Sequence, residues 1–303
     1  MTSGQGSASQ GSASRDNASQ SSASHGKAGA KGNTAMRTPA EDEAIDVAAI
    51  EAFTNQYGAR ATKLPALAIV IAAFNEQGSI GPVLEALPPE ISGLEVAKIV
   101  VSDGSSDGTV KEADAAGALV CDVPVNRGQG AALRLGYRLA REGGATYIVT
   151  TDADGQYNPA EIPNLLKPLI AGEADFASGS RAMGSEETKD PVRKLGVRVF
   201  ALTISLLTGQ KVTDPSFGLR AMRAEVTGAV KLQQPQYQSA ELLIGVIAHG
   251  YKYVELPATI HKRKVGQSKK GHNALYGLYF ARVIGGTWWR ERRRRNTAKS
   301  KSS

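Results

Sequence analysis

From Leu67 onward, short apolar segments alternate with segments of helical periodicity, and this alternation limits the possible folds more than any other feature. Apolar runs of about four to eight residues between turn residues are typical of buried strands. Such runs occur at Leu67–Phe74, Lys98–Ser102, Leu119–Val123, Tyr147–Thr151 and Asp175–Ser178. Strands separated by helices predict an α/β fold, in which a doubly wound, mostly parallel sheet has helices on both faces.

Helices are predicted between and after these strands. One is expected to begin after Ser79, a typical N-cap residue, with Pro82 in its first turn. Further helices are predicted at Gly128–Arg141, Pro159–Ile170, Val192–Leu207 and Ala240–His249. In the second half, Thr213–Met222 has a strand-like pattern and Tyr251–Ile260 is predicted as a strand.

The two ends of the chain differ in composition from this region. In residues 1–40 the pentapeptide Gln5–Ser9 is repeated at Gln10–Ser14, followed by more small and polar residues. Such residues cannot bury enough apolar area to offset the entropy lost on ordering, so a disordered tether is predicted. One domain is predicted at residues 60–268, followed by an aromatic and basic C-terminal segment at residues 269–303.

Composition limits the cellular setting. The single cysteine, Cys121, excludes an internal disulfide framework and fits a reducing compartment. The N-terminal residues lack the basic and apolar pattern of a secretory signal. No apolar run approaches the roughly 18–20 residues that span a bilayer. We therefore expect a cytoplasmic protein that is soluble or peripheral on the cytoplasmic face of a membrane.

The positive charge is concentrated at the C-terminal end. Residues 290–303 contain seven basic side chains and one acidic side chain, a net +6 out of +7 for the whole chain. The rest is close to neutral, so a basic face for nucleic acid is not expected. The C-terminal arginines leave one alternative to an enzyme open, an RNA-associated scaffold with a relict catalytic fold.

Polar clusters follow three of the predicted strands: Asn75-Glu76, Asp103–Asp107 and Asp152-Ala-Asp154. In an open parallel sheet, ligands bind beyond the carboxyl ends of the strands. Two carboxylates one residue apart repel each other unless a cation lies between them, and oxygen ligands suit Mg²⁺ or Mn²⁺. The alternatives are ordinary turns, since Asp-Gly is a common turn dipeptide and aspartate a common helix cap.

Other nucleotide-binding motifs do not fit. The segment Asn126–Gly130 contains Gly-x-Gly, but it lacks the third glycine of a dinucleotide fingerprint, and the chain contains no phosphate-binding loop of the Gly-x-x-x-x-Gly-Lys type. A nucleotidyltransferase would be expected to carry a glycine- and arginine-rich loop after the first strand, and Ala72–Gly78 is not one.

Taken in order, six motifs resemble those of the family 2 inverting glycosyltransferases, above all the dolichyl- and polyprenyl-phosphate sugar synthases such as dolichyl-phosphate mannose synthase. They are Ala72–Glu76, Asp103–Thr109, Asn126–Gly130, Asp152–Gln156, Gly179–Arg181 and Asp214–Arg220. The resemblance implies a GT-A fold, a nucleotide-sugar donor such as GDP-mannose or a UDP-sugar, a divalent metal ion and a polyprenyl- or dolichyl-phosphate acceptor.

The resemblance also implies roles for individual residues. The nucleotide-binding set is Ala73, Asn75, Glu76, Asp103, Ser105 and Asp152. The metal-binding set is Asp152, Asp154 and Gln156, and the catalytic set is Asp154, Arg181 and Glu241.

The nature of the acceptor decides which further residues are needed. A lipid phosphate is already ionised and needs cations rather than a base, and arginine pairs well with phosphate. The candidates are Arg181, Arg198, Arg220 and Arg263, although Arg198 could lie on a solvated helix face and Arg220 in a structural ion pair. If the acceptor is instead a sugar hydroxyl in cell-envelope polysaccharide synthesis, a base is required, and Glu241 is the candidate. Gln129 occupies a position where the lipid-phosphate enzymes commonly have lysine.

The aromatic segment Asn273–Trp289 is flanked by basic residues. Tyrosine and tryptophan favour membrane interfaces, and basic side chains are attracted to anionic lipid. We expect this segment to dock the enzyme on a membrane surface, and a membrane-embedded partner is a further expectation. The alternative is a helix packed on the domain and followed by a solvated tail.

Overall fold

The structure, a computed structural model, describes residue 1 and residues 37–187, 190–263 and 273–301. Most of the predicted tether at residues 1–40 lies outside these ranges, as do residues 264–272, on which the predicted end of the domain at residue 268 falls. The described residues from 37 onward belong to one compact unit.

A mixed eight-stranded sheet forms its centre, in the order β2-β3-β1-β5-β7-β6-β8, with β4 paired to β3. Neighbours are parallel in the pairs β1–β3, β3–β4, β1–β5 and β6–β8, and antiparallel in β2–β3, β5–β7 and β6–β7. The strands are β1 (Leu67–Ala73), β2 (Glu90–Ile91), β3 (Leu94–Asp103), β4 (Leu119–Val123), β5 (Tyr147–Thr150), β6 (Phe176–Glu186), β7 (Arg220–Arg223) and β8 (Tyr253–Ile260). The predicted doubly wound, mostly parallel sheet is confirmed.

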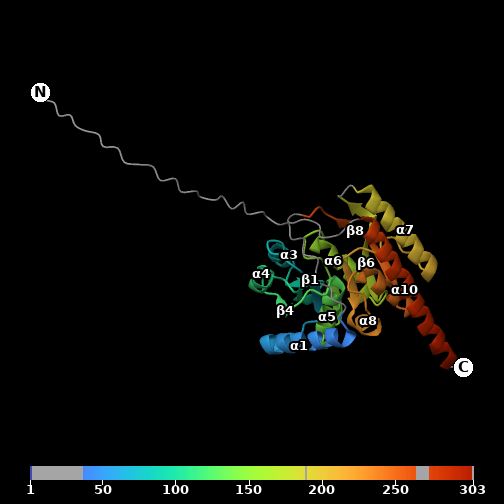
Figure 1. The fold of residues 1–303 in the computed structure, drawn as a ribbon, viewed down its shortest axis with the longest axis horizontal. Helices are drawn as coiled ribbons and strands as arrows, with labels where there is room; N and C mark the ends of the chain where they lie inside the picture. Colours follow the sequence, from blue (N-terminus) through green and yellow to red (C-terminus); the bar gives the residue numbers. More distant parts are fainter. Residues whose placement is uncertain (2–36, 188–189, 264–272, 302–303) are drawn as a thin grey trace, which may run out of the picture. The chain divides into compact units, whose positions relative to one another are not determined.

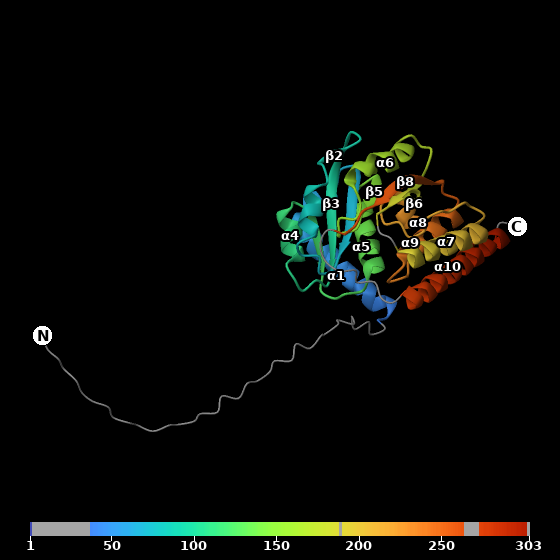
Figure 2. The same cartoon turned by 90° about the horizontal axis from the view of Figure 1, so that it is seen from above.

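Helices cover both faces of this sheet (Figures 1 and 2). They are α1 (Pro39–Tyr57), α2 (Ala59–Thr62), α3 (Ile80–Glu85), α4 (Thr109–Ala115), α5 (Gln129–Glu142), α6 (Ile162–Ile170), α7 (Pro191–Thr208), α8 (Ala224–Ala229), α9 (Gln238–Ala248) and α10 (Asn273–Lys301), with a 3₁₀ turn at Pro159–Glu161. Alternate residues of β1 serve two cores, as expected for a strand buried on both faces. Ala68 and Val70 pack with α1, α5, α9 and α10, whereas Ile69 and Ile71 pack with α3, α4 and α6.

Two local predictions need correction. Ser79 is at the start of α3, but its hydroxyl donates to the Glu76 carbonyl (2.9 Å) instead of capping the helix. The Glu112 carboxylate takes that role, because it accepts the N–H groups of Gly78 (2.6 Å) and Gly81 (2.8 Å). Of the predicted strand Thr213–Met222, only the last three residues form a strand, as part of β7 (Arg220–Arg223). The preceding residues form a loop, in which the Glu255 carboxylate accepts the N–H group of Thr213 (2.7 Å).

Both flanking helices pack on the central domain. Ala49 and Phe53 of α1 and Phe280 and Ile284 of α10 belong to one hydrophobic core. The helix α10 lies alongside α7 (Figure 2) and also contacts α9. The compact unit therefore extends beyond the predicted bounds of residues 60–268, and the described part of the C-terminal segment is a packed helix.

Candidate active site

The carboxyl ends of β1, β3 and β5 lie at one edge of the sheet, because β1 is parallel to both neighbours. The register pairs Ala73 at the end of β1 with Ser102 of β3. The three predicted polar clusters follow these ends, so the fold brings them to the same edge. This is where open α/β sheets bind their ligands.

The loops that follow β1 and β3 are tied together by hydrogen bonds. The N–H group of Asn75 donates to Ser105 Oγ (3.1 Å), and the N–H group of Ser106 donates to Asn75 Oδ1 (2.8 Å). Asn75 has a φ of +52°, a left-handed conformation that asparagine adopts more readily than most residues. The N–H group of Glu76 donates to Thr109 Oγ1 (2.8 Å). The structure thus places Asn75, Glu76 and Ser105 side by side.

Asp103 is held from the loop that follows β4. Its Oδ2 accepts the N–H groups of Arg127 (2.9 Å) and Gly128 (2.6 Å), which assigns a role to the Asn126–Gly130 motif. The residue is only 2% exposed, and Oδ1 has no hydrogen-bond partner among the residues that the structure describes. Burial raises the pKa of Asp103, and the two N–H groups oppose this effect. A buried acceptor without a donor is a place where a ligand can donate.

The acidic pair follows β5. Asp152 Oδ1 accepts a hydrogen bond from Gln129 Nε2 (3.2 Å). Asp154 is buried; its Oδ1 accepts the N–H group of Gln156 (3.0 Å) and its Oδ2 pairs with Arg263 Nη2 (2.6 Å). Arg263 lies beyond the end of β8 and is 109 residues away in sequence. The acidic pair therefore faces a cation from the far half of the sheet.

The donor set restricts which metal ion this edge could hold. Among residues 37–187, 190–263 and 273–301, no group of three or more histidine, cysteine, aspartate or glutamate side chains could hold a metal ion. Gln156, predicted as a ligand, donates its Nε2 to the His261 carbonyl (3.1 Å). Asp152 and Asp154 therefore offer two carboxylates, which suits Mg²⁺ or Mn²⁺ arriving with substrate phosphates rather than an ion held by protein alone.

The predicted acceptor arginines lie in different surroundings. Arg181 is buried, and its Nε pairs with Asp214 Oδ2 (2.6 Å) while its Nη1 lies 3.4 Å from Glu186 Oε1. Burial alone would lower the pKa of Arg181, but Asp214 and the other nearby acidic groups outweigh it and raise the pKa. Arg220 is also buried and donates to the Pro215 carbonyl (3.4 Å). Arg198 is exposed on α7.

The predicted base, Glu241, lies inside the protein at the start of α9. It is 0% exposed, and its Oε2 accepts the N–H groups of Gln233 and Gln234 (both 2.9 Å). Its Oε1 pairs with Arg290 Nη1 of α10 (2.8 Å). Both oxygens are engaged, so these contacts give Glu241 a structural role: it fixes the loop before α9 and attaches α10 to it.

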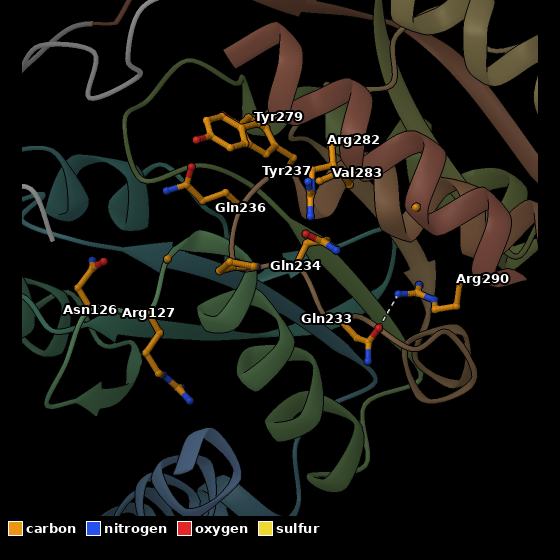
Figure 3. A pocket seen from close by; sticks show the side chains of 13 residues that line it. Asn126, Arg127, Gln233, Gln234, Gln236, Tyr237, Tyr279, Arg282, Val283 and Arg290 are labelled. Carbon is orange, nitrogen blue, oxygen red and sulfur yellow. Dashed lines mark hydrogen bonds between the residues drawn. The ribbon is translucent and has the colours of Figure 1, made fainter. Parts of the chain in front are cut away.

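A cavity of about 680 Å³ lies between α10 and the loop of residues 233–237 (Figure 3). Tyr279 and Arg282 line it from α10, and Asn126 lines it from the loop that holds Asp103. Its lining does not include Asp103, Asp152 or Asp154. The cavity is therefore bordered by the loop of residues 126–128, which also holds Asp103.

Three features of the structure are not predicted from the sequence. Arg127 and Glu255 bind segments of the site, and nothing local in the sequence indicates their distant partners. The third feature is an apolar stripe on the exposed face of α7, formed by Val192, Leu195, Val199, Leu202 and Leu206. Its spacing of three and four residues is visible in the sequence. The sequence does not show which apolar face of the helix is exposed, because a second apolar set, which is buried, occupies the other face.

An α/β domain with acid-bearing loops at the carboxyl ends of β1, β3 and β5 has the GT-A architecture. Glucosyl-3-phosphoglycerate synthase from Mycobacterium tuberculosis has this fold, with a TM-score of 0.59 and 23% identity over 79% of this chain and 83% of that one. The same enzyme in complex with Mn²⁺, UDP and phosphoglyceric acid gives a TM-score of 0.58 at 22% identity, covering 79% of this chain and 82% of that one. At this identity the likeness shows the fold alone.

The sequence comparison is more specific. Residues 68–230, more than half of the chain, match Glycosyl transferase family 2, and the chain belongs to this family. It is 33% identical to a dolichyl-phosphate hexose transferase of Haloferax volcanii over 67% of this chain and 86% of that protein. It is 32% identical to the polyprenol monophosphomannose synthase of Mycolicibacterium smegmatis over 70% of this chain and 83% of that protein.

Proposed function

We propose that this protein transfers a sugar from a nucleotide-sugar donor, with inversion, to a polyprenyl- or dolichyl-type lipid phosphate. The observation that carries the proposal is the meeting of Asp103, Asp152 and Asp154 at one sheet edge, with Arg263 bound to Asp154. The names of the two relatives support a lipid-phosphate acceptor.

The donor would bind across the loops after β1, β3 and β5. Asp103 Oδ1, a buried acceptor without a partner among the described residues, would accept a hydrogen bond from the base or ribose. Asp152 and Asp154 would hold Mg²⁺ or Mn²⁺ together with the diphosphate. When bound, such an ion neutralises the charge that develops on the departing nucleoside diphosphate.

The acceptor would need a cation and no base. A lipid phosphate carries negative charge at neutral pH and can attack the sugar directly, whereas a sugar hydroxyl must lose a proton. Arg263 can exchange the Asp154 carboxylate for a phosphate, because both are anions that accept from a guanidinium. Glu241 is enclosed and bound on both oxygens, which argues against the hydroxyl acceptor.

The membrane surface would be formed by α7 and α10. Among the described residues, no helix combines the length and apolarity needed to cross a bilayer. The apolar stripe of α7 is exposed, with Leu206 at 76%, and the helix also carries Arg193, Lys194 and Arg198. An apolar face beside basic residues is typical of helices that lie in a membrane interface. We propose peripheral docking through this stripe and through the basic α10.

Vesicle co-sedimentation tests the docking. The triple substitution of Leu195, Leu202 and Leu206 by serine should reduce binding to vesicles that contain anionic lipid by about tenfold or more, since each buried leucine contributes about 1.5–3 kcal/mol. Wild-type binding by the triple variant would contradict the docking. Substitution is preferable to deleting α10, because Phe280 and Ile284 belong to the core.

A transfer assay tests the function. The protein is incubated with labelled GDP-mannose or UDP-glucose, Mn²⁺ or EDTA, and polyprenyl phosphate, phosphoglycerate or no acceptor. Label in the lipid fraction that depends on polyprenyl phosphate is the expected result. Transfer to phosphoglycerate alone would contradict the lipid acceptor, and undiminished transfer in EDTA would contradict the metal ion.

A further inference from the structure

Helix α1 lies outside the residues that match the family, yet it contacts the loop that holds Asp103. The match covers residues 68–230, and α1 spans Pro39–Tyr57. The loop of residues 126–128 connects α1 to Asp103, since its N–H groups bind the Asp103 carboxylate and the Arg127 side chain reaches α1. A segment in this position can influence the donor site without touching the donor.

The first connection is made by Arg127. Its side chain is buried, and Nη2 pairs with Asp46 (2.7 Å) while Nη1 donates to the Asp42 carbonyl (3.1 Å). Its own backbone N–H group donates to Asp103 Oδ2 (2.9 Å). In Figure 3 the Arg127 side chain points away from the cavity and toward α1. One residue thus joins α1 to the carboxylate of Asp103.

The second connection runs through Arg37, just before α1. Its Nη2 donates to the Asn126 carbonyl (3.0 Å), and its Nε lies 3.6 Å from Asp42 Oδ1. Asn126 in turn donates its Nδ2 to the Asp103 carbonyl (3.1 Å). The side chain and the main chain of Asp103 are therefore each reached from the N-terminal part of α1.

The turn after β3 leaves little freedom between these parts. Gly104 has a φ of +74°, and a Cβ there would lie 2.4 Å from the Asn126 nitrogen. A displacement of the loop of residues 126–128 must therefore displace the turn that carries Asp103. Close packing transmits such shifts because protein interiors have few voids.

The other end of α1 is anchored independently. The Tyr57 hydroxyl accepts the Val120 N–H group of β4 (2.9 Å) and donates to Asp114 (3.3 Å), and Phe53 is buried in the core. We propose that α1 is a positioning element of the donor site, which fixes the Asp103 carboxylate through Arg127 and Arg37. This inference rests on the proposed function, because it takes Asp103 as the nucleoside-binding acid.

Three variants of the full chain test the inference. Asp46→Asn weakens the pair with Arg127, and Arg37→Gln removes the bond to Asn126. Glu43→Gln is the matched control, because Glu43 also joins α1 to the domain, but through Arg138 of α5 (2.8 Å) and not through the loop of residues 126–128. Affinity for UDP and GDP is measured by calorimetry with Mn²⁺, and melting temperature by calorimetric scanning.

We expect Asp46→Asn and Arg37→Gln to weaken nucleotide binding by about tenfold, the effect of misplacing one hydrogen-bonding group. In the transfer assay the donor KM should rise while kcat and the lipid-acceptor KM stay within about twofold of wild type. Glu43→Gln should match wild type in all of these. A general loss of structure would move both KM values and the melting temperature together.

The outcomes separate the two proposals. Equal nucleotide affinity in wild type and both variants would overturn the positioning role of α1 and leave the proposed function intact. Failure of the wild type to bind either UDP or GDP would overturn the proposed function and the inference with it. If Asp46→Asn does not fold, Arg37→Gln alone tests the inference. The Arg37 side chain is 22% exposed, so its replacement should leave the core intact.

Discussion

The two halves of the sheet use their charged residues differently. In the first half, Asp103, Asp152 and Asp154 lie at the ends of parallel strands and accept mainly from backbone N–H groups and side-chain amides. In the second half and in the helix α10, Arg181 and Arg290 are bound in ion pairs with buried acids. At its sheet edge the first half leaves carboxylate oxygens available to the proposed ligand, although its Arg127–Asp46 pair is buried, whereas the second half uses charge to hold the fold together.

The difference has a physical basis. Removing one partner of a buried ion pair leaves an uncompensated charge at low dielectric, so such pairs cannot readily be opened for a substrate. A carboxylate that accepts from backbone N–H groups keeps further lone pairs for a donor or a cation. Arg263 joins the two halves, because it comes from the second half and pairs with an acid of the first.

The largest expected effect is on catalysis in the first half. Asp154→Asn should reduce kcat/KM by about 100-fold or more, since a neutral amide no longer balances a cation at the diphosphate. Stability should change little, because asparagine can still accept the Gln156 N–H group. Steady-state transfer and thermal melting check this. Asp122→Asn, an exposed acid on β4, is the control; similar activity in both variants would remove the distinction between the acidic edge and ordinary surface acids.

The next comparison is between two arginines. Arg181→Gln should lower the free energy of unfolding by about 3–5 kcal/mol, because Asp214 loses its buried partner. Arg263→Gln should lower it by less, about 1–2 kcal/mol, since Asp154 is buried but the Arg263 side chain is 21% exposed to water. The main effect of Arg263→Gln should be a higher KM for the lipid acceptor. Urea unfolding and acceptor titration measure both quantities, and equal destabilisation by the two variants would contradict this difference between the halves.

A third variant addresses the enclosed acid of the second half. Glu241→Gln should cost about 1–3 kcal/mol of stability, because it weakens the bond to Arg290 and the hold on the Gln233 and Gln234 N–H groups. Transfer at saturating substrate should stay within about twofold of wild type, with the same pH profile. A large loss of kcat in a fully stable variant would restore Glu241 as the base for a hydroxyl acceptor.

The same contrast explains what the sequence could predict. The sheet, its helices and the meeting of three polar clusters follow from local patterns, because carboxyl ends of parallel strands must share an edge. The partners of the charged residues do not follow, since Arg263 and Asp154 are 109 residues apart, Arg127 and Asp46 81, and Arg290 and Glu241 49. These pairs depend on how loops and flanking helices pack, which the spacing of residues along the chain does not encode.

The smallest expected effect concerns Asp103. Keeping this buried carboxylate ionised and available to a ligand should reduce the stability of the fold. Burial raises the pKa of this carboxyl above its ordinary value. A carboxyl with a raised pKa in the folded state destabilises the fold at any pH above that raised value, and has no such effect below the pKa of the unfolded chain. Ionised Asp103 is therefore a small cost at neutral pH that a bound nucleotide would offset.

Asp103→Asn should remove this cost. Asparagine keeps an oxygen for the N–H groups of Arg127 and Gly128 and carries no charge. Melting temperature near pH 7.5 should rise by roughly 2 °C, and the gain should vanish as the pH falls below about 3, where the wild-type carboxyl is neutral in both states. Affinity for UDP and GDP should fall in the same variant. A lower melting temperature at neutral pH, or unchanged nucleotide affinity, would show that Asp103 supports the fold in the way that the ion pairs of the second half do.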